Sequence, residues 1–148
     1  MTENYPDYIP CPFEGIIDLD IPRTFPEDPF FYCKETRDKL KRILLAYARR
    51  CNSIGYCQGF NYFVGKILKV TEDEEEAFWI FTRLIEGILP MNYFCELAGM
   101  MTDSTILMNI LKKSDPEIFD HLRQLESDIY LNNVVYQWLL SVFVKGTT

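Results

Sequence analysis

Two side chains on irregular segments, Arg23 and Gln58, have residue types that suit the chemistry of a phosphate. Arginine carries a permanent positive charge on a planar fork, which can neutralise charge that develops on a transferring phosphoryl group. Glutamine is uncharged and both donates and accepts hydrogen bonds, so it can orient an attacking water without keeping its proton. Together the pair would be able to complete a phosphate site in another protein. The alternative for Arg23 is a surface arginine that pairs with Asp20 or Asp28.

Other catalytic schemes find little support in the chain. No Gly-x-Gly-x-x-Gly or Walker loop occurs, so we do not expect the chain to bind nucleotide phosphates by itself. No serine lies in a nucleophile elbow, and the single histidine, His121, is far in sequence from every cysteine, which argues against a triad and a zinc site. Cys57 has no identifiable base and is interpreted as a packed thiol. We therefore expect no metal ligands and no cofactor of the chain's own.

The stretch 52–62, which reads NSIGYCQGFNY, must position Gln58 between Gly55 and Gly59. Gly55 permits the backbone geometry of a tight connection, and Ser53 is expected to cap the helix that follows. From Gly59 onward apolar residues fall on nearly all sides, which predicts a mostly buried helix. Gln58 then lies at or near the N-terminal end of that helix, where free N–H groups and the helix dipole favour anions and oriented water.

Arg23 lies in a segment, residues 16–31, that prolines prevent from forming one continuous helix. Asp20 comes three residues before Arg23, so the two side chains would meet across a single turn. Residues 1–15 contain three further prolines and no hydrophobic period, and they are predicted to form an irregular arm.

The remaining elements are predicted to be helices, which makes the fold class all-α. The clearest spans Glu35–Arg50, where apolar residues recur at helical spacing. Capping boxes at residues 71–74 and 114–117 predict the starts of two helices. The first of these helices is expected to end at Leu89-Pro90, and the second carries apolar residues as far as Leu125. Residues 91–98 are expected to form a looser link. A helix over 104–113 is expected to turn four residues inward: Ile106, Leu107, Ile110 and Leu111. Residues 134–144 fit a buried helix or a strand, and we favour the helix.

The bulk composition excludes several classes of protein. The 148 residues have the size of one domain, and the net charge of −7 argues against nucleic acid as a partner. Five cysteines, an odd number, predict reduced thiols in the cytosol. No apolar run is long enough for a transmembrane segment, and we expect no signal peptide. The basic segment 34–50 and the acidic run 72–76 are both interpreted as solvated helix surfaces.

Two motifs carry a resemblance to a known family. The sequences Ile17-x-x-Asp20-x-x-Arg23-Thr-Phe-Pro and Ile54-Gly-Tyr-Cys-Gln58-Gly-Phe-Asn61-Tyr resemble the two signature motifs of the TBC domain, the Rab GTPase-activating domain, and their separation matches as well. The similarity continues through four further stretches: 74–79, 88–90, 102–103 and 137–140. It implies a multi-helix TBC-type domain over residues 16–148.

The resemblance also implies roles for individual residues. Arg23 would stabilise charge on the γ-phosphate of GTP bound to a Rab GTPase, and Gln58 would position the hydrolytic water. Asp20 would help to hold Arg23, while Tyr56, Gly59 and Asn61 would support the loop that carries Gln58. GTP and magnesium would belong to the partner, so the chain would be a GTPase activator and not a self-contained enzyme. Its expected setting is vesicle trafficking and intracellular protein transport in the cytoplasm, with peripheral endomembrane association through the partner.

By the same resemblance the chain is shorter than the family's domain at both ends. Helices before the first motif and the portion after the helix that contains Trp138 would be missing. Apolar faces would then be exposed, which invites self-association. A non-catalytic helical adaptor that binds a GTPase or a trafficking protein therefore stays open as the alternative, and the basic segment 34–50 gains a second possible role in facing the partner.

Overall fold

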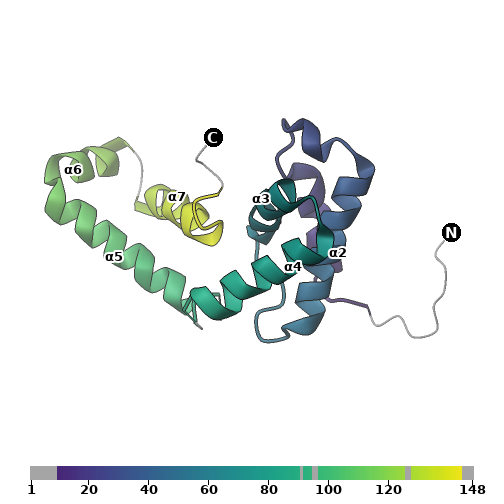
Figure 1. The fold of residues 1–148 in the computed structure, drawn as a ribbon. Helices are drawn as coiled ribbons and strands as arrows, with labels where there is room; N and C mark the ends of the chain where they lie inside the picture. Colours follow the sequence, from purple (N-terminus) through teal and green to yellow (C-terminus); the bar gives the residue numbers. More distant parts are fainter. Residues whose placement is uncertain (1–9, 91, 95–96, 126–127, 145–148) are drawn as a thin grey trace.

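All regular structure in the described residues is helical, as predicted (Figure 1). The computed structural model describes residues 10–90, 92–94, 97–125 and 128–144, and the side chains of 125–132 are outside that description. In chain order the elements are α1 (Glu14–Asp20), η1 (Ile21–Arg23), η2 (Pro29–Phe31), α2 (Lys34–Arg50), α3 (Phe60–Thr71), α4 (Glu74–Arg83), η3 (Leu84–Ile88), α5 (Ala98–Ser114), α6 (Pro116–Leu125) and α7 (Asp128–Leu140). The labels η1 and η2 denote 3-10 turns, and η3 is a π-helical turn that continues α4.

Prolines divide the segment that carries Arg23, as the sequence predicts. Pro22 opens η1 directly after α1, and Pro29 opens η2. Helix α1 begins at Glu14, which lies inside the arm predicted over residues 1–15, because Cys11 and Phe13 already accept backbone hydrogen bonds of a forming turn. Residues 1–9 of that arm lie outside the described part of the chain.

An aromatic cluster joins α2, α3 and α4 into one packed lobe. The Phe60 ring lies 5.1 Å from the Phe81 ring and 5.9 Å from the Tyr47 ring, in edge-to-face arrangements that aromatic pairs prefer. Phe94, from the link after η3, contacts Phe60 at 4.8 Å. Because Phe60 is the first residue of α3, this core fixes the end of the helix that follows Gln58.

Helices α5 to α7 form an arm that leaves this lobe and returns to it. Figure 1 shows α5 leading away from the lobe, α6 turning at the far end, and α7 folding back toward α3. The helical alternative for residues 134–144 is confirmed as far as Leu140, and the strand alternative is wrong. No described helix is long and apolar enough to cross a membrane.

Three predicted helix caps are wrong in position. The N-cap of α4 is Asp73, whose carboxylate accepts from the Glu76 amide at 2.8 Å, because Thr71 still belongs to α3. Asp115, and not Ser114, caps α6 in the same way at 3.0 Å, because the Ser114 hydroxyl donates to the Ile110 carbonyl at the end of α5.

The third predicted cap that is wrong in position is the N-cap of α3. Ser53 lies in a turn well before the helix, and the N-cap position is taken by Gly59 with a left-handed φ of +112°. The intervening residues 54–58 form the irregular loop that presents Gln58.

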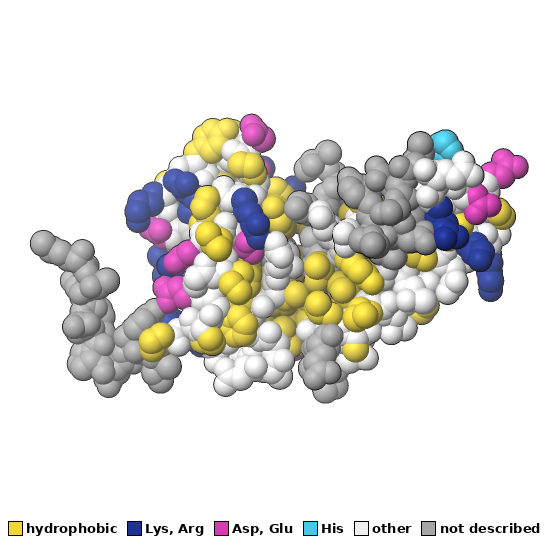
Figure 2. Space-filling view, turned by 180° about the vertical axis from the view of Figure 1, so that it is seen from behind, with side chains coloured by type: hydrophobic (Ala, Val, Ile, Leu, Met, Phe, Trp, Pro, Cys, Tyr) yellow, Lys and Arg dark blue, Asp and Glu magenta, His cyan; other side chains and the backbone are white. Residues whose placement is uncertain are grey.

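Helix α5 starts at Ala98, six residues before its predicted start, and its inward face agrees with the prediction only in part, at the partly buried Leu107 and Leu111. Ile106 and Ile110 are 49% and 56% exposed. The side that faces the rest of the arm carries Met100, Ser104 and Leu107, because α6 and α7 pack along that stripe. Figure 2 shows hydrophobic side chains gathered across the middle of the face seen from behind.

Candidate functional site

The structure brings Arg23 and Gln58 to one cavity of about 150 Å³. Its lining comes from three parts of the chain: η1, the loop and first turn of α3, and the C-terminal end of α7. The residues are Arg23, Gln58, Gly59, Tyr62, Gln137, Leu140 and Ser141, and we call this the Arg23–Gln58 cavity. The two candidate residues, 35 positions apart in the sequence, are therefore available to a single ligand.

Arg23 is held by Asp20, as the spacing predicts. The Arg23 side chain is 51% exposed and forms an ion pair with the carboxylate of Asp20, which is completely buried. The Arg23 carbonyl also accepts a hydrogen bond from the Tyr62 hydroxyl at 3.2 Å. A buried carboxylate needs a paired charge and hydrogen bonds to be stable, so Asp20 fixes one end of the guanidinium while the other end stays open to the cavity.

A buried hydrogen-bond network ties the Arg23 segment to the Gln58 loop. The Tyr56 hydroxyl donates to the Asp20 carboxylate, 36 residues away in the sequence. The Asn61 amide donates to the Thr24 hydroxyl at 2.8 Å, and that hydroxyl donates to the Asp20 carbonyl, also at 2.8 Å. Burial and the hydrogen bond to Asp20 raise the pKa of the Tyr56 phenol, so it stays protonated and remains a donor. The loop and η1 are thus positioned by the same side chains.

Glycine is required at both ends of the Gln58 loop. Gly59 has φ of +112°, and a Cβ at this position would lie 2.8 Å from the Leu140 carbonyl oxygen of α7. Gly55 has φ of +64°, and a Cβ there would overlap the Phe13 ring. Gln58 itself is exposed and directly precedes Gly59. The backbone on either side of the glutamine is therefore confined, while its side chain is left accessible.

Several residues of this site were not predicted from the sequence. Thr24 lies inside the first motif, but nothing in its type marks it as a link between Asp20 and Asn61. Tyr62 ends the second motif, and its type alone does not indicate that its hydroxyl donates to the Arg23 carbonyl. Gln137, Leu140 and Ser141 come from the distant C-terminal end of α7 and the residue after it. The similarity over residues 137–140 was a signal for the first two and did not reach Ser141.

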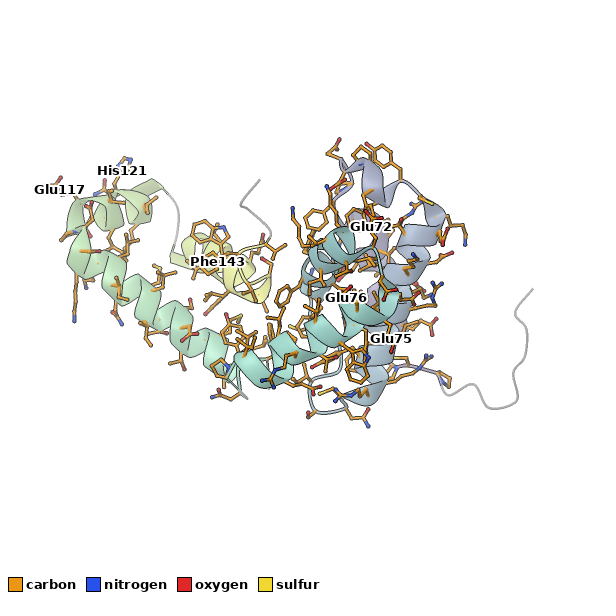
Figure 3. The ribbon with its side chains drawn as sticks, viewed as in Figure 1. Glu72, Glu75, Glu76, Glu117, His121 and Phe143 are labelled. Atoms are coloured by element: carbon orange, nitrogen blue, oxygen red, sulfur yellow. The ribbon has the colours of Figure 1, made fainter. Side chains whose placement is uncertain are left out.

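Cys57, the neighbour of Gln58, behaves as the packed thiol that was predicted. It is half-buried, and burial raises its pKa from 9.0 to about 11, which keeps it in the unreactive thiol form. Figure 3 places His121 and Glu117 on α6, at the far end of the arm from the α2–α4 lobe. Within the described residues no group of three or more His, Cys, Asp or Glu side chains is placed to hold a metal ion.

Several basic side chains of α2 are paired with acids of the same chain, among them Lys41 and Arg42. Lys41 contacts Asp18 at 2.6 Å and Glu14 at 3.2 Å, and Arg42 forms two hydrogen bonds with Glu74. These acids raise the pKa of both basic groups, Asp18 having the largest effect on Lys41. Their charge is largely compensated inside the molecule, which favours the interpretation of α2 as a helix surface.

The fold and these motifs define a TBC-type helical domain, and the comparisons with known proteins agree. The model of the Rab-GTPase-TBC domain family matches residues 2–147. The chain therefore belongs to the Rab-GTPase-TBC domain family, and the resemblance stated from its two motifs is confirmed.

Named relatives show how much of a larger protein the chain corresponds to. It is 39% identical over 133 residues to human TBC1 domain family member 2A, a match that covers 88% of this chain and 14% of that protein. It is 32% identical over 133 residues to growth hormone-regulated TBC protein 1 of Xenopus tropicalis, covering 87% of this chain and 38% of that protein. The chain thus spans well under half the length of the curated relatives it matches.

The fold also matches a solved structure. The crystal structure of the Ypt/Rab-GAP domain of Gyp1p superposes with a TM-score of 0.74 at 23% identity, covering 93% of this chain and 51% of that one. At this level of identity the match shows the fold alone.

Proposed function

We propose that the chain activates GTP hydrolysis by a Rab-family small GTPase, with Arg23 and Gln58 supplied in trans to the partner's nucleotide. The observation that carries this proposal is the Arg23–Gln58 cavity, in which a half-exposed guanidinium and an exposed amide share one space. Membership of the Rab-GTPase-TBC family supports the choice of partner.

The geometry suits stabilisation of charge that develops during phosphoryl transfer. Asp20 holds Arg23 from the buried side, so the open side of the guanidinium would reach the γ-phosphate of bound GTP with little loss of conformational freedom. Docking of the partner would remove water from the cavity and strengthen this interaction. An arginine supplied in this way accelerates hydrolysis by roughly 10³–10⁵-fold.

Gln58 would position the attacking water. Its amide both donates and accepts, so it would bond the water and an acceptor beside it at the same time. Gln58 directly precedes Gly59, the N-cap residue of α3, so its exposed side chain lies at the entrance of that helix. It would therefore take the role that a glutamine of the GTPase otherwise fills.

GTP and magnesium would both come from the partner in this proposal. The GTP-bound form is the expected target, because the open side of the Arg23 guanidinium, which Asp20 does not occupy, would find an anionic acceptor only while a γ-phosphate is present. The chain would act in the cytoplasm in vesicle trafficking and reach endomembranes through the Rab protein that it binds.

The test is single-turnover GTP hydrolysis across a panel of Rab proteins. We expect the chain to accelerate at least one of them, and Arg23→Ala and Gln58→Ala each to remove most of that acceleration. Asn133→Ala, an exposed amide of α7 outside the cavity, is the matched control. Calorimetric binding to a Rab without any change in hydrolysis would instead indicate the non-catalytic adaptor.

A further inference from the structure

One wall of the Arg23–Gln58 cavity comes from α7, which belongs to neither of the two motifs that carry Arg23 and Gln58. Gln137, Leu140 and Ser141 form this wall. It is held at two points: the Leu140 carbonyl packs on Gly59 of the Gln58 loop, and the hydroxyl of Tyr93, in the link after η3, donates to the Leu139 carbonyl at 3.1 Å. The return of α7 toward α3 is visible in Figure 1. The wall therefore has a defined position relative to Gln58.

Gln137 supplies the polar group that this wall presents to the cavity. Leu140 is apolar, and the Ser141 hydroxyl donates to the Gln137 carbonyl at 2.8 Å within the helix. The Gln137 side chain is exposed, and no described residue forms a hydrogen bond with its amide. Two carboxamides, Gln58 and Gln137, thus line the same small space from different elements.

Carboxamides are complementary to each other because each carries both donors and acceptors. Gln58 has several rotatable bonds, and it must lose this freedom when it orients a water molecule. A second amide across the cavity would bind one end of Gln58 and leave the other end for the water.

We propose that Gln137 is a positioning residue for Gln58, and that its amide hydrogen-bonds the Gln58 amide when a Rab partner closes the cavity. This inference rests on the proposed function of Gln58. Gln137 acts through Gln58 and not through Arg23, whose orientation is already fixed by Asp20. Its loss should therefore lower the rate of hydrolysis in the complex and leave partner affinity nearly unchanged.

The experiment measures kcat and KM for activation of a responsive Rab by the chain with Gln137→Ala. We expect kcat to fall about five- to tenfold, as for loss of one hydrogen bond in a reactive geometry, with KM within about twofold. Gln137→Asn, which keeps a shorter amide, should give an intermediate kcat. Asn133→Ala lies one helical turn away on the same stripe and should leave both constants unchanged.

A double-mutant cycle separates positioning from a general structural effect. In a Gln58→Ala background, Gln137→Ala should have no further effect, because nothing is left to position. In an Arg23→Ala background it should keep its full effect. A purely structural role would lower the rate in both backgrounds and would also lower the melting temperature of the chain.

Failure of the positioning role of Gln137 can be distinguished from failure of the proposed function. If the unaltered chain activates a Rab but Gln137→Ala does not change kcat, or changes it equally in the Gln58→Ala background, the positioning role is wrong and the proposed function stands. If the unaltered chain accelerates no Rab of the panel, the proposed function is wrong and the inference falls with it.

Discussion

The central residue of the site is Asp20, although it does not face the cavity. Its buried carboxylate pairs with Arg23 and accepts from Tyr56, and its carbonyl accepts from Thr24. Through Asn61, which donates to Thr24, the same cluster reaches the first turn of α3. A change to any of these side chains should therefore affect both Arg23 and Gln58, even though neither is altered.

Tyr56→Phe should both destabilise the chain and weaken activation. The substitution removes a buried hydrogen bond to a charged group, which costs about 1–3 kcal/mol in the free energy of unfolding. It also leaves Asp20 with fewer partners, so the guanidinium of Arg23 would be drawn inward. Urea unfolding and Rab-stimulated hydrolysis would measure the two effects.

Tyr32→Phe is the control for that substitution, because Tyr32 is exposed and its hydroxyl makes only a long, exposed bond to the Glu27 carbonyl. Its free energy of unfolding should stay within about 0.5 kcal/mol of the unaltered chain. Equal stability for Tyr56→Phe and Tyr32→Phe would contradict the network.

Cys57 should react slowly with alkylating reagents at neutral pH. Its pKa is raised to about 11, so at pH 8 only about one molecule in a thousand carries the reactive thiolate. The alkylation rate should rise about tenfold for each pH unit between pH 7 and pH 10, followed by mass spectrometry. The exposed Cys33 provides a second labelled position for comparison. A rate for Cys57 that levels off below pH 9 would refute the raised pKa.

At the scale of elements, the site depends on how closely α7 approaches the start of α3. The contact is a backbone carbonyl of Leu140 against the α-carbon of Gly59, so no side chain can be accommodated between them. Helix α7 is therefore a structural part of the site as well as a source of one of its walls.

Gly59→Ala should displace α7 and lower activation together. A residue with a Cβ pays roughly 1–2 kcal/mol for the left-handed conformation, and overlap with the Leu140 carbonyl adds to that cost. We expect a lower melting temperature and a loss of Rab-stimulated hydrolysis. Gly15→Ala is the matched control, since no atom lies near its added Cβ and the residue is within α1. An unchanged melting temperature and rate for Gly59→Ala would mean that α7 does not pack there.

At the scale of the whole molecule, the α5 arm leaves apolar surface uncovered. Ile106 and Ile110, four residues apart on one face of α5, are both about half exposed. Exposed apolar patches of this kind promote association between copies. The double substitution Ile106→Lys and Ile110→Lys should therefore reduce concentration-dependent association in sedimentation velocity while leaving the melting temperature nearly unchanged. If the unaltered chain stays monomeric at high concentration, this surface does not drive association.

Local patterns were enough to predict most helices and the two irregular segments that carry Arg23 and Gln58. The helical spacing of apolar residues predicted α2, and the prolines predicted the divided segment before it. The spacing of Asp20 and Arg23 predicted their contact. The caps of α4 and α6 were displaced by two residues and one residue, because several neighbouring side chains of the right type compete for each of these helix starts. Asp73 and Asp115 took positions that Thr71 and Ser114 also fitted.

Tertiary contacts account for what the sequence did not reveal. A periodic pattern shows that α5 has an apolar stripe, but only the packing of α6 and α7 decides which residues of it are covered. In the same way, nothing local to Gln137 indicates that it shares a cavity with Gln58, because that depends on the return of α7 across the molecule.

The most direct test of the account uses a Rab protein whose own water-positioning glutamine has been replaced by leucine. If Gln58 is supplied in trans, the chain should still accelerate GTP hydrolysis by this Rab, by roughly 10³-fold or more, and Gln58→Ala should abolish the acceleration. Arg23→Lys should abolish it as well, because lysine keeps the charge but lacks the planar fork. The opposite result, acceleration that disappears with the Rab glutamine yet survives Gln58→Ala, would contradict the central claim.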